Sequence, residues 1–289
     1  MRISINSLKT PLRYPGGKSR ALKKLFKYIP DLNEYEEFRE PFLGGGSVSL
    51  KITKRYPNLR IIVNDLYKPL FIFWQQLQDH GDKLSEELRQ VKTTYNNQDK
   101  ARFLFDISKL HLHSGWEGSL SDFEIAVNFY IVNKCSYSGL SENSTFSPQA
   151  SDSNFTIRNI DKLKWYQELI QTWEITNQSY ETLLTNNKNI FVYLDPPYEI
   201  ADSLYGKKGN MHKNFDHDLF AEDCQNNKCH QLISYNSSQL IKDRFKDWYS
   251  DEFAHTYTMV SNEKYTNNQS KRNELVLYNY KTTEQLKLF

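Results

Sequence analysis

The feature that most constrains the fold of this chain is an apolar run, Ile190–Leu194, that leads directly into Asp195-Pro196-Pro197-Tyr198. A continuous apolar run of this length is typical of a strand buried on both faces of a parallel sheet. The two prolines then stop ladder pairing and helix formation directly after the strand. Because ligands of open α/β sheets bind outside the carboxyl ends of the strands, this turn is predicted to lie at the active site.

The residue types of this turn suit the exocyclic amino group of a flat heterocycle. Such an amine, adenine N6 for example, is a poor nucleophile because its lone pair is delocalised into the ring. The Asp195 carboxylate and the Pro196 carbonyl can accept both N–H groups and draw the nitrogen toward a tetrahedral geometry, and Tyr198 offers a ring for stacking. The alternative is a tight turn that leaves a core strand, with Tyr198 as a lid on the core. The tetrapeptide alone does not decide between them.

Composition limits the classes of protein that this chain can belong to. Its 289 residues suffice for one large domain or for one domain with an insertion. The formal net charge is only +2, so any nucleic-acid site must be a local patch. No stretch approaches the ~18 apolar residues of a membrane span, and a secretory h-region is absent from the start of the chain. We therefore expect a soluble cytoplasmic protein without membrane contact.

The cysteines predict neither a disulfide framework nor a metal site. The chain has three of them, an odd number that is typical of a reducing compartment. Cys224, Cys229 and His230 are close in sequence but lack the second ligand pair that a zinc site needs. They are interpreted as ordinary thiols.

The periodicity along the chain predicts one α/β domain interrupted by a mostly helical insertion. A helix over 21–29, a short strand into Glu40, a helix from Ser47 and a strand over 59–63 form the start of a doubly wound sheet. Between about 75 and 170 the alternation is lost, and the pattern is helical to about 133. Strands are expected again at 174–176, 190–194, 231–235, 253–260 and 274–280. The predicted units are a discontinuous domain of residues 1–75 and 171–289 and an insertion of residues 76–170.

A glycine loop and a later aspartate predict an adenosine-containing cofactor. Gly44-Gly45-Gly46 joins a strand to a helix, and Asp65 stands 19 residues after Gly46, at the end of the next strand. Glycines let a backbone approach a ligand closely, and an acidic residue at this distance suits a ribose hydroxyl pair. The loop is also a near match to the dinucleotide fingerprint, so NAD or FAD stays open. The alternative without a ligand is a flexible turn and a surface aspartate.

The Gly16-Gly17-Lys18-Ser19 turn is not a P-loop. The first glycine of that motif would fall on Leu12, and no strand clearly precedes it. A lysine here can instead meet the carboxylate of an amino-acid moiety, or it can be a solvated turn residue.

Taken together, these motifs resemble those of the Dam-type (alpha-group) DNA adenine N6-methyltransferases. The order is Tyr14–Lys18, then Glu40–Ser47, then Asp195–Tyr198 after a large gap. Asn133–Leu140 is similar to the recognition segment of that family and Arg272–Val276 to its final strand, so the resemblance extends over nearly the whole chain. It implies a Rossmann-like SAM-dependent methyltransferase sheet, interrupted by a mostly helical DNA-recognition insertion.

The resemblance also implies an activity and the residues that carry it. The expected activity is site-specific transfer of the methyl group of S-adenosylmethionine (SAM) to N6 of a flipped adenine, without a covalent intermediate or a metal. Asp195, Pro196, Pro197 and Tyr198 would be catalytic, with Lys18 near the methionine carboxylate and Asp65 on the ribose. The full set expected to bind the cofactor is Tyr14, Gly17, Lys18, Pro41, Phe42, Leu43, Gly44, Gly46, Asp65, Ser179, Tyr180 and Asp195.

The expected partner is double-stranded DNA, bound by a monomer in a bacterium or by a phage-encoded enzyme in one. The candidate contacts are Lys134, Tyr137, Ser138, Asn143, Arg158, Lys207, Lys213, Lys271 and Arg272. Ser141-Glu142-Asn143 follows Gly139-Leu140 where GATC-reading members commonly have an arginine, so a GATC target is not supported. The sequence neither requires nor excludes a restriction endonuclease partner.

Three other activities stay open at this point. SAM-dependent methylation of RNA adenine or of cytosine N4 needs similar residues. A nicotinamide- or flavin-dependent oxidoreductase would use the glycine loop but gives the Asp195–Tyr198 turn no task. A DNA-binding module without catalysis would give no reason for Lys18, Asp65, Asp195 and Tyr198 to occur together.

Overall fold

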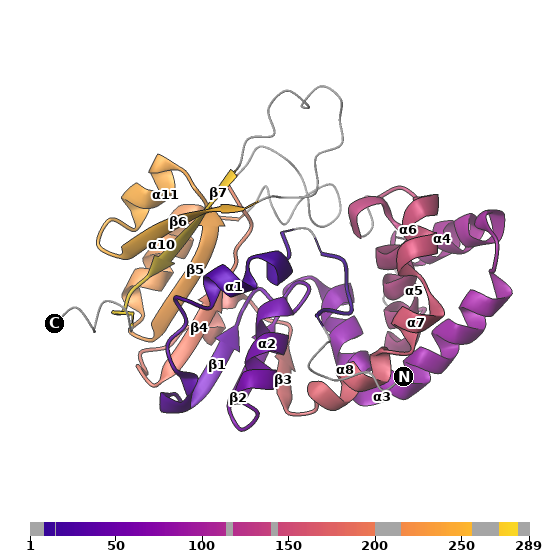
Figure 1. The fold of residues 1–289 in the computed structure, drawn as a ribbon, viewed down its shortest axis with the longest axis horizontal. Coiled ribbons are helices and arrows are strands. Elements are labelled where there is room, and N and C mark those ends of the chain that lie inside the picture. Colours follow the sequence, from indigo (N-terminus) through magenta and orange to yellow (C-terminus); the bar gives the residue numbers. More distant parts are fainter. Residues whose placement is uncertain are drawn as a thin grey trace.

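The computed structural model describes residues 9–14, 16–113, 118–139, 144–199, 215–255 and 272–282, with the backbone alone for residues 138, 255 and 272. Its centre is a seven-stranded sheet of order β3-β2-β1-β4-β5-β7-β6 (Figure 1). The strands are β1 (Glu37–Glu40), β2 (Arg60–Asn64), β3 (Trp173–Thr176), β4 (Ile190–Leu194), β5 (His230–Asn236), β6 (Tyr249–His255) and β7 (Arg272–Tyr278). Strands β1 to β5 pair in parallel, whereas β7 is antiparallel to β5 and β6.

Strand β4 lies at the middle of this sheet, as its apolar run predicts. All five of its residues are buried, and it pairs in parallel with β1 on one side and β5 on the other. Side chains alternate between the faces of a strand, and both faces of β4 are covered. Phe191 and Tyr193 pack into one core, while Val192 and Leu194 pack into a second. The expected α/β class with a doubly wound sheet is confirmed, with β1 to β5 parallel and β6 and β7 completing a mixed sheet.

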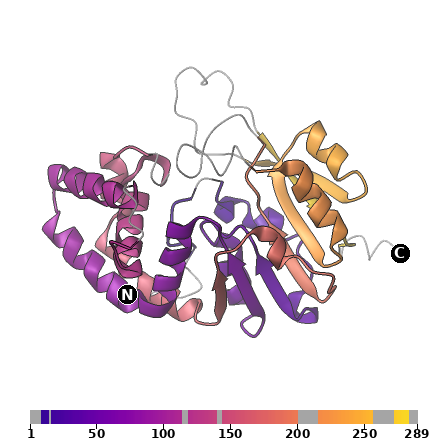
Figure 2. The ribbon, with the colours of Figure 1, turned by 180° about the vertical axis from the view of Figure 1, so that it is seen from behind.

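Different helices cover the two faces. The first core includes residues of α1 (Leu22–Leu25) and α2 (Ser47–Arg55), and the second includes α10 (His217–Asn226) and α11 (Gln239–Arg244). Figures 1 and 2 show α1 and α2 in front of the sheet in one view and α10 in front of it in the other. Short 3-10 turns, η2 (Lys18–Arg20), η3 (Leu32–Glu34) and η5 (Tyr180–Leu183), complete this part of the chain.

The insertion between β2 and β3 is helical and lies at one side of the sheet (Figure 1). Its elements are α3 (Lys68–Thr94), α4 (Gln98–His113), α5 (Asp122–Cys135), η4 (Tyr137–Gly139), α6 (Pro148–Asn154), α7 (Ile157–Ile160) and α8 (Leu163–Leu169). Helix α5 begins with a capping box, in which Ser121 and Glu124 satisfy each other's backbone N–H groups. The expected helical character of the insertion is confirmed.

Helix α3 runs through the predicted boundary between the two units. Trp74 near its start is fully buried, and its ring packs 5.6 Å from that of Trp173 in β3. The helix is kinked at His80, where φ is −137° and ψ is 29°. One apolar core continues from the sheet into the insertion. The division into residues 1–75 with 171–289 and residues 76–170 therefore stays a prediction.

Two expected elements differ from the structure by four residues at one end, whereas the other expected strands agree within two residues. The helix expected over 21–29 ends at Leu25, because Lys27 and Tyr28 bond to carbonyls three residues before them in tighter turns, and Pro30 then keeps Ile29 out of the α conformation. The strand expected at 253–260 is β6, which begins at Tyr249. Its first residues are polar because β6 is the edge strand and pairs only with β7. Residues 256–260 lie outside the described part of the chain.

Candidate active site

The segments singled out in the sequence meet at one edge of the sheet. The glycine loop follows β1, Asp65 follows β2, Ser179 and Tyr180 follow β3, and the Asp195–Tyr198 turn follows β4. The chain leaves β1 toward β2 on one side, while β4 pairs with the other side of β1. This reversal is a topological switch point, where open α/β sheets bind their ligands.

The glycine loop is packed too closely for side chains. Gly44 and Gly46 have positive φ angles of 49° and 67°. A Cβ atom on Gly44 would lie 2.9 Å from the ring of Tyr14, and one on Gly46 would lie 2.8 Å from the ring of Trp74. Trp74 also donates its indole N–H to the Gly44 carbonyl at 3.1 Å. The loop therefore takes its shape from Tyr14 on one side and Trp74 on the other.

Asp65 is bound to this loop by the backbone. Its Oδ2 accepts the N–H of Gly44 at 2.9 Å, and its Oδ1 accepts the N–H of Tyr67 at 3.0 Å. Burial raises the pKa of Asp65 to about 6, although both backbone hydrogen bonds act in the opposite direction. Each oxygen keeps acceptor capacity beyond its one backbone partner. The carboxylate thus fixes the loop and can still accept bonds from hydroxyl groups.

Asn64 joins three of these segments and was not singled out in the sequence. Its side-chain amide donates to the carbonyls of Pro41 at 3.0 Å and Gln178 at 2.9 Å, and its Oδ1 accepts the N–H of Gln178 at 2.8 Å. The side chain is 1% exposed. Because these partners follow β1 and β3, and Asn64 is the last residue of β2, its side chain sets the spacing between three strand ends.

We expect Asn64→Ala to lower the free energy of unfolding by about 2–4 kcal/mol, because it leaves several buried polar groups without partners. Urea unfolding measures this loss. Asn177→Ala is the matched control, since it removes an amide that donates to the Asp65 and Leu66 carbonyls from a half-buried position. The control should lose about 1 kcal/mol. Equal losses in the two variants would contradict the bridging role of Asn64.

Lys18 and Asp195 form the centre of the site. The Lys18 Nζ lies 2.7 Å from both Asp195 carboxylate oxygens and 2.8 Å from the Tyr198 hydroxyl. It also donates to the Gly16 carbonyl at 3.0 Å and lies 3.4 Å from Oε1 of Glu274. More acceptors surround the ammonium than it has hydrogens, so none is left for another partner in this arrangement.

Burial and charge act against each other in this cluster. Burial raises the pKa of Asp195 to about 6, the Lys18 ammonium opposes this rise, and Glu274 adds to it. Burial alone would lower the pKa of Lys18, but the carboxylates of Asp195 and Glu274 hold it above its ordinary value. Lys18 is therefore charged, and Asp195 is ionised above about pH 6.

Tyr198 is held at both its ring and its hydroxyl. The ring stacks on that of Tyr235 with centroids 6.0 Å apart, and the hydroxyl donates to Glu274 at 2.6 Å. Pro196 is buried and Pro197 half-buried, so the turn is fixed against the sheet. The Asp195 side chain is 20% exposed and can be reached from outside.

An aromatic group lies beside the glycine loop. The ring of Phe42 stacks on that of Tyr180 with centroids 5.5 Å apart, and Phe215 and Phe220 pack against both. The Tyr180 hydroxyl donates to Asp223 at 2.6 Å. Ser179 donates its hydroxyl to Glu181. This group offers flat apolar faces with polar atoms at their rim.

The expected recognition segment is docked on the N-terminal motif. Asn133 accepts the N–H of Arg13 at 3.0 Å and donates to the Arg13 carbonyl at 2.6 Å. The Arg13 guanidinium donates to the Ser136 carbonyl at 2.7 Å. Tyr14, the next residue, packs on the glycine loop. The recognition segment is thereby connected to the glycine loop through Arg13 and Tyr14.

The structure places the expected DNA contacts unequally. Lys134 is only 6% exposed, and its Nζ lies 5.1 Å from the ring centre of Tyr130. Burial lowers the pKa of Lys134 to about 7. Tyr137 and Arg158 are exposed. The other expected contacts lie outside what the structure describes, namely Asn143, Lys207, Lys213, Lys271 and the side chains of Ser138 and Arg272.

Sequence reasoning assigned no role to Glu274, Tyr235 or Asn133, all of which contact the site or its supports. Glu274 had a signal, because it is a carboxylate next to the apolar run Leu275–Leu277. Asn133 was quoted only as part of the resemblance. Tyr235 has no signal beyond its place in a strand.

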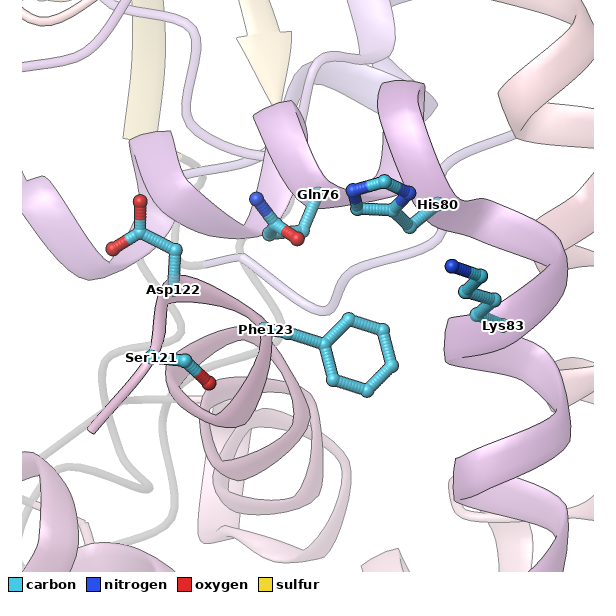
Figure 3. A pocket seen from close by; sticks show the side chains of 6 residues that line it. All are labelled: Gln76, His80, Lys83, Ser121, Asp122 and Phe123. Carbon is cyan, nitrogen blue, oxygen red and sulfur yellow. The ribbon is translucent and has the colours of Figure 1, made fainter.

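A separate hollow of about 430 Å³ lies on the insertion and contains none of the expected site residues. It is lined by Gln76, His80 and Lys83 of α3 and by Ser121, Asp122 and Phe123 at the start of α5 (Figure 3). The Ser121 hydroxyl already donates a hydrogen bond to the Glu124 carboxylate. The hollow is therefore not part of the strand-end site.

The thiols and the helices set further bounds. Cys135, Cys224 and Cys229 are buried free thiols. Within the described ranges, no three His, Cys, Asp or Glu residues gather as a metal ion would require. No helix in the part of the chain that the structure describes is long and apolar enough to cross a membrane.

Comparisons with known proteins agree with this geometry. A family model described as D12 class N6 adenine-specific DNA methyltransferase matches residues 14–279. The chain is 22% identical over 281 residues to the type II methyltransferase M1.LlaDCHI of Lactococcus lactis subsp. cremoris, which covers 93% of this chain and 94% of the relative. It is 21% identical over 290 residues to the type II methyltransferase M.CviBI of Paramecium bursaria Chlorella virus NC1A, covering 94% and 100%. It is also 24% identical over 199 residues to the type II methyltransferase M.MjaIII of Methanocaldococcus jannaschii, covering 65% and 68%.

Proposed function

Because the chain belongs to the D12 class N6 adenine-specific DNA methyltransferase family, we propose how its own residues perform the reaction of that family. The reaction is the methylation of adenine N6 in DNA, and the resemblance indicated by the sequence motifs is confirmed.

We propose SAM as the donor, bound along the ends of β1, β2 and β3. When bound, it supplies an electrophilic methyl group. The residues at these ends fit it: Asp65 can accept ribose hydroxyls, and the Phe42–Tyr180 pair offers faces for an adenine ring. The cofactor set of the sequence prediction, from Tyr14 to Asp195, is retained in the proposal, with one change of role.

The change concerns Lys18. The resemblance implied a place near the methionine carboxylate, but the ammonium is already surrounded by Asp195, Tyr198, Gly16 and Glu274. These contacts favour a role of Lys18 in holding the Asp195 carboxylate rather than the methionine carboxylate. An ammonium 2.7 Å from both oxygens stabilises the carboxylate form, which is the form that can accept hydrogen bonds from an amine.

Asp195 and the Pro196 carbonyl would hold the target amine. Accepting both N–H groups draws N6 toward a tetrahedral geometry and exposes its lone pair. Once N6 has taken the methyl group, Asp195 is placed to receive the proton that the nitrogen must lose. The adenine has to leave the duplex to reach this turn, because the carboxylate lies at the sheet edge among packed side chains. Positioning by the rigid Pro-Pro turn supplies much of the rate.

One observation carries the proposal. A buried ion pair, a stacked tyrosine, a glycine loop and a second carboxylate meet at the ends of neighbouring parallel strands. An oxidoreductase built on the glycine loop would leave the Lys18–Asp195–Tyr198 cluster unused. The type II names of the relatives further support a modification enzyme that reads a defined DNA site.

The test is transfer of labelled methyl groups from SAM to unmethylated genomic DNA, followed by sequencing that maps N6-methyladenine. We expect one recurring motif, which also decides whether GATC is the target. Methylation at scattered adenines would mean that the insertion contacts backbone rather than bases. No incorporation, with SAM still bound, would overturn the DNA proposal and leave RNA as the acceptor, whereas labelled DNA without N6-methyladenine would indicate cytosine N4. The Asp195→Ala variant is the negative control.

A further inference from the structure

We propose that Glu274 is a positioning residue of the active site, which holds the Lys18 ammonium and the Tyr198 hydroxyl in the arrangement that Asp195 needs. The inference rests on the proposed role of Asp195 toward the target amine. It adds a fifth strand, β7, to the machinery that the sequence placed on the segments after β1, β2, β3 and β4.

Glu274 is a buried carboxylate with specific partners. Its side chain is 0% exposed, and it pairs in register with Asn236 of β5, beside the Asp195–Tyr198 turn. It accepts the Tyr198 hydroxyl at 2.6 Å and lies 3.4 Å from the Lys18 Nζ. Burying an ionised carboxylate is costly unless it is paired and hydrogen-bonded. Its neighbours Leu275, Val276 and Leu277 are buried and apolar, so packing alone does not explain a carboxylate here.

The contacts form a chain of fixed direction. Lys18 donates to the Tyr198 hydroxyl, and that hydroxyl donates to Glu274. Lys18, Tyr198 and Glu274 come from η2, from the turn after β4 and from β7, three segments far apart in sequence. Glu274 therefore ties the ammonium and the tyrosine to the rigid part of the sheet. Without it, both groups lose the acceptor that orients them toward Asp195.

The role of Glu274 can be measured through the pKa of Asp195, which a loss of packing alone would not shift. The groups that act on Asp195 are Lys18 of η2, Tyr198 of the same turn, Glu274 of β7, Glu40 at the end of β1 and Tyr193 of β4. Glu40 has its pKa raised to about 8 by burial, so it is mostly uncharged at neutral pH. Among the charged groups, Lys18 lowers the pKa of Asp195 and Glu274 raises it. Removing the Glu274 charge must therefore lower the pKa of Asp195, whereas removing the Lys18 charge must raise it.

The experiment measures kcat against pH for the wild type, Glu274→Gln and Lys18→Met on a DNA that the wild type methylates. Activity needs ionised Asp195, so it falls as the pH drops through its pKa, which is about 6. Glu274→Gln should reduce kcat by about tenfold or more at its best pH, since the negative charge that strengthens the Tyr198 hydrogen bond and pairs with Lys18 is lost. Its acid limb should move to lower pH, while that of Lys18→Met should move to higher pH.

The double variant separates positioning from general support of the fold. If Glu274 acts through Lys18, adding Glu274→Gln to Lys18→Met should change kcat by less than about twofold, whereas independent effects would multiply. The SAM affinity and the melting temperature of each variant show whether it folds. If Glu274→Gln does not fold, Glu274→Asp, which keeps the charge, takes its place. Glu274→Asp should retain the acid limb of the wild type.

Two results would overturn the inference. One is a Glu274→Gln enzyme with kcat within about twofold of the wild type or with an acid limb that stays in place or rises. The other is full multiplication of the two single effects in the double variant. Failure of the proposed function looks different, because the wild type itself would then transfer no methyl group to DNA.

Discussion

Asp195→Ala should abolish turnover while SAM binding is at least partly retained. The carboxylate is the acceptor proposed for the target amine, and no other side chain replaces it at the end of β4. General acid–base and positioning groups contribute about 10²–10⁴-fold in rate, so we expect a loss near the upper end of that range. Single-turnover methylation of DNA measures the rate, and calorimetric titration with SAM measures binding.

The structure explains why the loss should be confined to the chemical step. Besides the Asp195 carboxylate, the Lys18 ammonium has the Tyr198 hydroxyl at 2.8 Å and Glu274 at 3.4 Å as partners, and these remain available in the variant. The glycine loop and Asp65 are held by Tyr14, Trp74 and backbone N–H groups that do not involve Asp195. The cofactor part of the site is therefore expected to stay in place.

The matched control is Asp251→Ala. Asp251 also accepts a tyrosine hydroxyl, that of Tyr278 at 2.8 Å, but it lies on the edge strand β6 and not in the proposed site. This variant should keep turnover within about threefold of the wild type, as expected for a surface substitution. Near-normal turnover in Asp195→Ala would remove the proposed role of the carboxylate.

The residues that the sequence could predict are those whose signal is local. The apolar run before Asp195 marks β4, because burial on both faces requires apolar residues at every position. The spacing from the glycine loop to Asp65 reflects one strand–helix–strand unit, and the structure shows that unit as β1, α2 and β2. Such features need no knowledge of how distant segments meet.

The remaining contacts depend on tertiary docking. Lys18 and Asp195 are 177 residues apart, and Arg13 and Asn133 are 120 apart, so no periodicity links them. Lys134 belongs to a segment that looks polar, yet its side chain is buried against Tyr130. Glu274 meets Lys18 and Tyr198 only because β7 turns antiparallel beside β5, which the strand pattern does not specify. Pairing partners of this kind follow from the fold and not from local propensity.

Gly139→Ala should damage both the stability of the protein and its cofactor site. Gly139 has a positive φ of 74°, and a Cβ atom there would lie 2.6 Å from the Arg13 Cβ and 2.6 Å from the Arg13 carbonyl oxygen. Backbone atoms cannot move aside as the end of a flexible side chain does. Arg13 is also held by Asn133 and by Ser136. The recognition segment and the N-terminal motif would therefore have to separate.

The control for this substitution is Gly118→Ala. Gly118 also has a positive φ, 89°, but nothing lies within 4 Å of a Cβ atom placed on it. The control should lose about 1–2 kcal/mol from the left-handed backbone alone. Gly139→Ala should lose about 3 kcal/mol or more, because steric overlap adds to the same strain. Urea unfolding of both variants gives the difference.

The effect should reach SAM through Tyr14, which follows Arg13 and packs on Gly44. We expect SAM affinity to fall at least about tenfold in Gly139→Ala and to stay unchanged in Gly118→Ala, although neither glycine belongs to the proposed cofactor site. Titration with SAM, well below the melting temperature of each variant, measures this. Equal affinities in the two variants would mean that Arg13 anchors the insertion without shaping the glycine loop. A selective loss would show that the segment expected to read DNA and the loop expected to bind the cofactor are mechanically joined.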